Sequence, residues 1–401
     1  MGRDTDKAKV VIAGGGIGGL TAALSLLKRG FAVEVYEQAK QLSEVGAGLQ
    51  LSANANRVLF ALGLGESLYA VGSQPTGKRL RLWNTGDQWD YFDLGMVSEE
   101  KYGAPYFTIY RPDLLDLLAK AVEAQQPGTI RLGKKIASVS DAGARPEIVF
   151  EDGTRASGDV LVGADGVHSV VRNHLWGEGD PVYSGNLAWR GVIRMDRLPA
   201  RLQQGISVLW VGPGAHIVHY PLRQGKLLNF VGVVERSEWV GESWSQQGTR
   251  EELHNDYAKW HEDVHALIDH IDTPFKWSLR GRQPLTQWSK GRVALLGDAC
   301  HPTLPFLAQG AVMAIEDGYV LARALDGHAD AAQALQAYDA ARVERANSLV
   351  SKSTENGKRF HSDELINPAT AKNYIDREWS EASIGQRYDW LYGYDADRVP
   401  V

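Results

Sequence analysis

The sequence has little of several features that mark specialised classes of protein. Its single cysteine, Cys300, cannot form an internal disulfide, which excludes a stapled secreted scaffold. No apolar run reaches the ~18–20 residues of a membrane span, and the first residues lack the apolar centre of a signal peptide. Repeats and low-complexity tracts are also missing from the sequence. We therefore expect a cytoplasmic protein without membrane attachment.

An excess of basic residues is missing as well. The chain has 43 Lys and Arg against 49 Asp and Glu, which gives a formal net charge of −6. It therefore lacks the excess of positive charge that is typical of proteins that bind nucleic acid. With 44% hydrophobic and 23% charged residues, it has the composition of a globular protein. Its 401 residues exceed the ~250–300 of a single hydrophobic core, so two domains are expected. A monomer and a homodimer both remain open.

The amino-terminal part has the pattern of a βαβ unit. The strand, the helix and the second strand are predicted at residues 9–13, 21–29 and 31–37. Between the first strand and the helix, Gly14, Gly16 and Gly19 form G-x-G-x-x-G, which allows a tight turn, a close approach of pyrophosphate and close helix packing. Glu37 ends the second strand, where a carboxylate can accept hydrogen bonds from ribose hydroxyls. The order of these elements favours a dinucleotide site over a glycine-rich turn with a solvated glutamate.

The predicted secondary structure of the remaining chain changes type several times. A hairpin is predicted near 78–94, short strands recur from about 181 to 284, and buried strands are predicted at 159–163 and 292–296. This pattern predicts an α/β nucleotide-binding domain that is split by an inserted antiparallel sheet. The expected boundaries are 1–75, 100–180 and 285–345 for the nucleotide-binding domain, 76–99 and 181–284 for the sheet domain, and 346–401 for a C-terminal helical segment.

Two later segments each place an acidic residue after a predicted strand. The first contains Asp165 and Gly166, and the second contains Gly297 and Asp298. Ligands of open sheets bind at the carboxyl ends of parallel strands, so both segments are expected near the dinucleotide. Taken alone, each could equally be a helix N-cap or a turn.

In this order, the glycine fingerprint and the two acidic segments resemble the single-component FAD-dependent aromatic hydroxylases, which include para-hydroxybenzoate, salicylate and 3-hydroxybenzoate hydroxylases. Arg111, at a predicted helix start, resembles the flavin-contacting arginine of that family. The resemblance implies a Rossmann-like FAD-binding domain with an inserted, mainly antiparallel substrate sheet, as in para-hydroxybenzoate hydroxylase. It also implies noncovalent FAD, NADH or NADPH as co-substrate, Asp298 beside the ribityl chain, and Asp165 and Gly166 near the pyrophosphate and the visiting nicotinamide.

The inserted sheet contains the candidate catalytic residues. A period of two places His216, Val218 and Tyr220 on one face of a strand and Ile217 and His219 on the other. The resemblance favours the first face for the substrate, because 3-hydroxybenzoate 6-hydroxylases have a His and a Tyr at this spacing. Histidine suits the removal of a phenol proton. A histidine that is merely satisfied within the sheet is the alternative.

The loop after the second acidic segment leads into a predicted helix at Gly310 and Ala311, whose N-terminus can stabilise the negative charge of a reduced flavin. Pro305 matches a family proline that borders flavin and substrate. The loop resembles salicylate hydroxylases more closely than 3-hydroxybenzoate hydroxylases. A substrate carboxylate needs a donor, and Arg190 and Arg223 are both candidates.

The expected activity is hydroxylation of a small phenolic acid by O2 and NAD(P)H through a flavin hydroperoxide. Salicylate, converted to catechol with loss of carbon dioxide, is the favoured substrate. A 3-hydroxybenzoate 6-hydroxylase that forms gentisate and a hydroxynicotinate-type monooxygenase are alternatives. A flavin oxidase or dehydrogenase with a non-aromatic substrate, and a nicotinamide-binding regulator, are rivals from other classes.

One motif points to different chemistry. His261 and His265 form H-E-x-x-H with Glu262, the pattern of zinc peptidases. The neighbouring apolar residues have the spacing of an amphipathic helix, and apart from His270 no third ligand stands nearby. We therefore expect no metal site.

Overall fold

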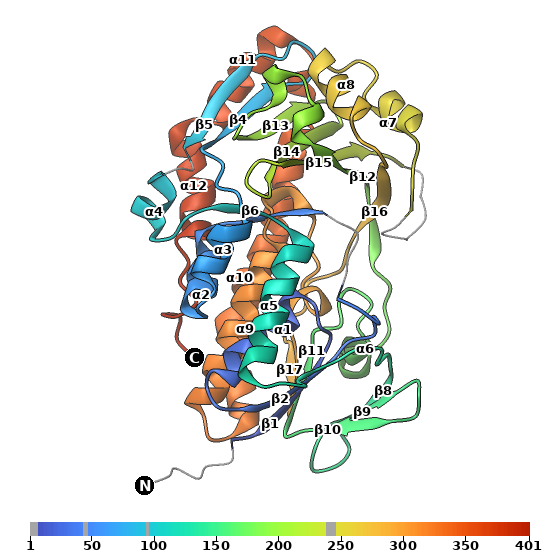
Figure 1. Cartoon of the computed structure of the whole chain (residues 1–401), viewed down its shortest axis with the longest axis vertical. Coiled ribbons are helices and arrows are strands. Elements are labelled where there is room, and N and C mark those ends of the chain that lie inside the picture. The colour runs from blue at the N-terminus through green and yellow to red at the C-terminus, as the bar shows by residue number, and fades with distance from the viewer. Residues whose placement is uncertain (1–6, 43–46, 94–95, 238–245) are drawn as a thin grey trace.

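The computed structural model describes residues 7–42, 47–93, 96–237 and 246–401. One end of the molecule is built on a six-stranded sheet (Figure 1). Its strands, in spatial order, are β17 (Ser289–Lys290), β18 (Val293–Leu295), β11 (Val160–Gly163), β1 (Lys9–Ala13), β2 (Ala32–Tyr36) and β7 (Ile130–Arg131). All neighbours pair in parallel except β17 with β18. The predicted βαβ unit is thus confirmed at the centre of the sheet.

Helices pack beside this sheet, and the longest of them extend towards the other end of the molecule. The helices beside the sheet are α1 (Ile17–Leu27), α5 (Arg111–Gln125), α6 (Val170–Trp176), α9 (Gly310–Gly327) and α10 (Ala331–Phe360). Helices α1 and α9 cross closely at glycine, since a Cβ on Gly318 would lie 2.6 Å from the Ala22 nitrogen. Helix α10 passes through position 346 without a break, so the domain boundary expected there falls inside one helix.

A seven-stranded sheet forms the other end of the molecule. Its strands, in spatial order, are β16 (Phe275–Gly281), β12 (Val182–Arg194), β15 (Leu227–Glu235), β14 (Ala215–Leu222), β13 (Ser207–Gly212), β4 (Gly77–Leu82) and β5 (Gln88–Asp93). Only β13 and β4 pair in parallel. A mainly antiparallel sheet inserted between parts of a nucleotide-binding α/β fold is what the sequence predicts, and the fold class is confirmed.

The outer face of this sheet has its own hydrophobic core. Side chains such as Trp189, Trp210 and Ile217 pack there with α7 (Arg250–Asp256) and α8 (Glu262–Asp269). Alternation along each strand therefore leaves the inner face to the rest of the molecule. Smaller elements complete the fold: β3 (Gly48–Leu51), β6 (Phe107–Tyr110), β8 (Ile136–Ser140), β9 (Glu147–Phe150), β10 (Arg155–Ser157), α2 (Ala53–Ala61), α3 (Gly65–Val71), α4 (Met96–Tyr102), α11 (Pro368–Glu378) and α12 (Glu381–Tyr392).

None of the helices formed by the described residues is both long enough and apolar enough to cross a bilayer.

Candidate active site

A cavity of about 320 Å³ lies between the inner face of the seven-stranded sheet and the nucleotide-binding end of the molecule. We call it the ring cavity. One wall is formed by the first turn of α1, the loop before α9 and the start of α9, and the other wall by side chains of β12, β14, β15 and β16. Its volume is within the range of small-molecule sites.

The three fingerprint glycines differ in what surrounds them. A Cβ on Gly14, whose φ is +113°, would lie 2.2 Å from the Ala164 carbonyl oxygen, and one on Gly19 would lie 2.1 Å from the Gly14 carbonyl oxygen. A Cβ on Gly16, by contrast, would meet no atom within 4 Å, and Gly16 lines the ring cavity. The chain therefore packs tightly around the turn and leaves open the position that a dinucleotide pyrophosphate would approach. This cradle fits FAD.

Glu37 supports the same turn. Its carboxylate oxygens accept hydrogen bonds from the Gly15 and Ala39 amides, each at 2.8 Å. A carboxylate oxygen has more than one acceptor position, so Glu37 can still accept from a ribose hydroxyl.

Asp165 takes a different position from Gly166. The Asp165 carboxylate accepts hydrogen bonds from the Ser169 hydroxyl and from the amides of Val170 and Val171 at the start of α6. Burial raises the pKa of this carboxyl group although these bonds favour its ionised form. Asp165 is absent from the cavity lining, whereas Gly166 is part of it. Ser169 is the N-cap of α6, and Asp165 supports this helix start by accepting from the Ser169 hydroxyl and from the first two amides of the helix.

The other residues that the resemblance assigned to FAD lie on the cavity wall. Asp298 is exposed and follows β18, while Arg111 begins α5. Gly310 and Ala311 form the first turn of the 18-residue helix α9, whose N-terminus opens onto the cavity. Pro305 stands in the loop that leads to this helix and also lines the cavity.

The sheet wall brings together the predicted ring-facing residues. His216, Val218 and Tyr220 of β14 line the cavity, whereas Ile217 and His219 do not. Within the described part of the chain, the Tyr220 hydroxyl and the Nε2 of His216 have no hydrogen-bond partner. Burial lowers the pKa of His219 on the opposite face to about 3, with a smaller contribution from Arg81. The strand phase predicted from the alternation therefore matches the cavity.

The structure separates the two candidate arginines. Arg190 lines the ring cavity, and its guanidinium carbon lies 3.7 Å from the centroid of the Trp277 ring. Arg223 is exposed and pairs with Asp113 through bonds of 2.9 and 2.7 Å. Of these two candidates, Arg190 is the one that is placed to meet a ligand in this cavity.

Sequence reasoning missed a buried ionic network behind the segment 297–309, which connects β18 to α9. Asp317 of α9 accepts from the Gly297 amide at 3.0 Å, from His301 at 2.5 Å and from Arg342 of α10 at 2.8 Å. Next to it, Glu316 accepts from Asn54 at 2.7 Å and pairs with Arg345 at 2.9 Å. The available signal was the adjacent acidic pair in the middle of an apolar helix, because buried carboxylates need partners.

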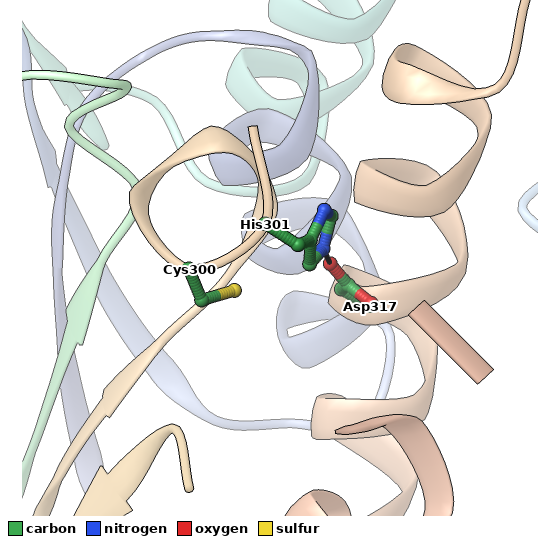
Figure 2. Close-up of side chains that lie close together, drawn as sticks. All are labelled: Cys300, His301 and Asp317. Atoms are coloured by element: carbon green, nitrogen blue, oxygen red, sulfur yellow. Dashed lines mark hydrogen bonds and ion pairs between the residues drawn. The ribbon is translucent and has the colours of Figure 1, made fainter. Parts of the chain in front are cut away.

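Figure 2 shows Cys300, His301 and Asp317 close together, a grouping that could in principle hold a metal ion. The chemistry of this set does not fit a metal. Both Asp317 oxygens already accept hydrogen bonds, one of them from a guanidinium. Burial raises the pKa of the Cys300 thiol well above its usual value, and the thiol donates to the Gly297 carbonyl at 3.3 Å. The group therefore braces the turn that precedes Asp298.

The H-E-x-x-H segment has a structural role too. His261 is the N-cap of α8, and its Nδ1 accepts from the Asp263 amide, so this nitrogen already has a partner. His265 instead lies 3.0 Å from His254 between ring nitrogens. The two histidines are therefore engaged separately.

Comparisons with known proteins agree with this geometry. A family model described as FAD binding domain matches residues 7–353. A 3-amino-4-hydroxybenzoate 2-monooxygenase of Streptomyces platensis is 37% identical and is aligned over 98% of both chains. A 6-hydroxynicotinate 3-monooxygenase of Pseudomonas fluorescens is 36% identical over 98% of this chain and 96% of the relative. The chain belongs to the FAD-dependent aromatic hydroxylases.

Two further comparisons place this hydroxylase within the family. A 3-hydroxybenzoate 6-hydroxylase of Polaromonas naphthalenivorans is 36% identical over 96% of each chain. A solved substrate complex of salicylate hydroxylase superimposes with a TM-score of 0.80 and 25% identity over 98% of this chain and 97% of that one. The resemblance seen in the sequence is confirmed. The enzyme is an FAD-dependent aromatic-ring monooxygenase with NAD(P)H as co-substrate.

Proposed function

We propose that the enzyme hydroxylates a small aromatic carboxylic acid that carries a ring hydroxyl, and that this substrate binds in the ring cavity. The observation that supports this most is the sheet wall, on which Arg190, His216 and Tyr220 converge. A guanidinium suits a carboxylate, and an imidazole with a phenol suits a ring hydroxyl. The aliphatic side chains of Val218 and Val231 on the same wall suit the face of a ring.

The opposite wall is the one that we propose holds FAD. The residues assigned to it are Gly14, Gly16, Gly19, Glu37, Arg111, Gly166, Asp298, Gly310 and Ala311, with Asp165 positioning the loop that contains Gly166. FAD supplies the oxygen-activating chemistry when it is bound. The N-terminus of α9 would stabilise negative charge on the flavin ring, and Pro305 would border flavin and substrate.

We propose that His216 accepts the proton of the ring hydroxyl and that Tyr220 orients that hydroxyl. Ionisation makes the ring electron-rich and so reactive towards an electrophilic oxygen. Arg190 would fix the orientation of the ring through the carboxylate, and orientation decides which carbon is attacked. Buried surroundings would exclude water from the reacting atoms.

Salicylate is the substrate that we propose to test first. Pro305 and Ala308 line the cavity, so the loop that resembles salicylate hydroxylases lies beside the proposed ring position. The relatives at 36–37% identity act on 3-amino-4-hydroxybenzoate, 6-hydroxynicotinate and 3-hydroxybenzoate, and these acids are the alternatives.

A substrate panel tests the proposal. Holoenzyme is mixed with each of these four acids and with NADH or NADPH, and cofactor oxidation, ring products and carbon dioxide are measured. We expect acid-dependent oxidation coupled to a hydroxylated product, with catechol and carbon dioxide from salicylate. Gentisate from 3-hydroxybenzoate, without turnover of salicylate, would correct the substrate and keep the class. Oxidation of a non-aromatic substrate, with no hydroxylated product from any ring acid, would contradict the proposal in favour of an oxidase or dehydrogenase.

A further inference from the structure

Two cavities of the enzyme approach each other at a pair of histidines. The ring cavity is lined by His216. A second cavity, of about 720 Å³, is lined by His361 and Glu235, and we call it the outer cavity. The two cavities have no lining residue in common, so the contact between His216 and His361 is a bridge between them.

A continuous chain of hydrogen bonds crosses this bridge. The Nδ1 of His216 lies 2.7 Å from the Nε2 of His361. The Nδ1 of His361 lies 2.9 Å from an oxygen of Glu235. The side chain of His361 is only 3% exposed, whereas that of Glu235 is 58% exposed. The chain therefore runs from the wall of a buried cavity to a carboxylate in contact with solvent.

Aromatic side chains enclose the buried part of this chain. The rings of Phe306 and Phe360 lie 5.4 and 5.1 Å from the ring of His216, measured between centroids. Such a surround leaves little polar surface for water beside the imidazoles. A proton that leaves His216 therefore has the His361 imidazole as its polar neighbour.

The exposed carboxylate fixes the tautomer of each histidine. Ionised Glu235 can only accept, so the Nδ1 of His361 donates to it and the Nε2 of His361 accepts. The Nδ1 of His216 must then donate to His361, which leaves the lone pair on the Nε2 of His216. That nitrogen has no partner within the described part of the chain, and its side chain lines the ring cavity. His216 is thereby prepared to accept a proton from a ligand.

We propose that His216, His361 and Glu235 form a proton relay that carries the proton of the substrate's ring hydroxyl from the ring cavity to the outer cavity. This inference rests on the proposed function. As the O–H bond breaks, its electrons stay on the oxygen as phenolate and the proton bonds to the Nε2 of His216. The Nδ1 proton of His216 moves to the Nε2 of His361, and the Nδ1 proton of His361 moves to Glu235. Glu235 releases it to solvent, and a proton returning to the product restores both tautomers.

The relay avoids a charged imidazole in the interior. Burial, with a further contribution from His361, lowers the pKa of His216 well below its usual value, so a lasting imidazolium there is unfavourable. Other ionisable groups face the chain: Arg190 shares the ring cavity, and Lys358 and Arg236 line the outer cavity. The Tyr257 hydroxyl donates to the backbone carbonyl of His216 at 3.3 Å. The cations Arg190, Lys358 and Arg236 oppose a positive charge on either histidine. They therefore favour a concerted shift of the protons along the relay.

The test follows ionisation of a bound phenol rather than turnover. Holoenzyme is mixed by stopped flow with 4-hydroxy-3-nitrobenzoate, whose phenolate absorbs visible light, in weak buffer at several pH values and in D2O. In Glu235→Gln the amide oxygen can still accept from His361 but cannot take up its proton. We expect ionisation to slow by about tenfold or more in Glu235→Gln and in His361→Gln, as for loss of a general base. The solvent isotope effect on the ionisation rate should change in the same variants. Their affinity for the probe should stay within about twofold of the wild-type value.

Matched variants separate proton transfer from structure. Glu355→Gln removes an exposed carboxylate of α10 that lines neither cavity and should leave the rate unchanged. Glu235→Asp, and added imidazole with Glu235→Ala, should restore part of the rate, because each returns a base to the outer cavity. Wild-type ionisation rates in both relay variants, or an equal loss of rate in Glu355→Gln, would overturn the relay. The proposed function would still stand in that case if turnover depends on FAD and on the aromatic acid. A wild-type holoenzyme that binds no phenolic acid would overturn both.

Discussion

Gly16 shows how one missing side chain opens the cofactor site. A Cβ there would meet no protein atom within 4 Å, and its φ of −72° is available to any residue. Gly16→Val should therefore fold normally and fill the space proposed for the pyrophosphate. We expect FAD affinity to fall by about 100-fold or more, which corresponds to ~2.7 kcal/mol, in titrations that follow flavin fluorescence.

Gly205→Val is the matched control for this prediction. Gly205 is also open, since an added Cβ would meet nothing within 4 Å, and it lines neither cavity. Its FAD affinity should equal that of the wild type. Normal FAD binding by Gly16→Val would contradict the assignment of this turn to the pyrophosphate.

The two arginines lead to opposite predictions for substrate affinity. Arg190 lines the ring cavity, whereas Arg223 is held by Asp113 at the surface. A charge-assisted hydrogen bond contributes about 1.5–3 kcal/mol, so Arg190→Gln should raise the KM for the ring acid by about 10- to 100-fold. Arg223→Gln should leave KM within about twofold. Steady-state kinetics at fixed NAD(P)H measure both, and the reverse pattern would show that the carboxylate binds elsewhere.

At the scale of elements, the buried network of Asp317 holds the segment between β18 and α9 in place through Gly297 and His301. Burial raises the pKa of Asp317, but His301 and Arg342 more than offset this, so the pKa lies below its usual value. Asp317→Asn removes the charge and leaves Arg342 buried with one partner fewer. Breaking a buried ion pair costs about 3–5 kcal/mol, and the free energy of unfolding should fall by about this amount in urea titrations.

An exposed ion pair supplies the comparison. Glu364 pairs with Arg377 at 3.0 Å, and both side chains are more than half exposed. Exposed pairs contribute about 0–1 kcal/mol, so Glu364→Gln should hardly change the unfolding midpoint. Similar losses in the two variants would mean that the buried network contributes no more than a surface pair.

The elements themselves could largely be predicted from the sequence, because each depends on local periodicity. Strand β1 was expected at its observed residues, and the alternation in β14 placed His216 and His219 on opposite faces. What could not be predicted are pairings between distant residues. His361 follows His216 by 145 positions, and tertiary packing alone decides that they share a hydrogen bond. The same holds for Asp165, whose alternative roles as cap and as ligand have the same local sequence.

At the scale of the whole molecule, the C-terminal segment packs against helices from earlier in the chain. The guanidinium of Arg57 in α2 donates to the carbonyl of Tyr392 at 2.8 Å, and Arg345 of α10 stacks 3.7 Å from the Tyr394 ring. The last helices thereby connect the nucleotide-binding end to the seven-stranded sheet. One of their aromatic side chains, Tyr392, lies with Tyr106 beside a cation of that sheet, Lys78 on β4.

We expect Lys78 to make the stability of the whole molecule depend on pH. Its ammonium lies 4.6 Å from the Tyr106 ring centroid and 3.4 Å from the Tyr392 hydroxyl, and burial lowers its pKa to about 7. In the unfolded chain the pKa of lysine is about 10.4. Between these values the unfolded state binds more protons than the folded state, so the free energy of unfolding rises with pH. Below pH 7 both states are protonated and the folded state bears the full cost of the buried charge.

Lys78→Met should remove this dependence. We expect the variant to be more stable than the wild type near pH 6.5 and to gain less stability between pH 7 and 9.5. The difference in slope is at most about 1.4 kcal/mol for each pH unit, and it is smaller near pH 7, where the folded state is still partly protonated. Urea unfolding of FAD-bound protein at several pH values measures both slopes, and titrations of other groups cancel in the comparison. Equal slopes in the two proteins would mean that Lys78 stays protonated among the tyrosines, held there by their rings and hydroxyls.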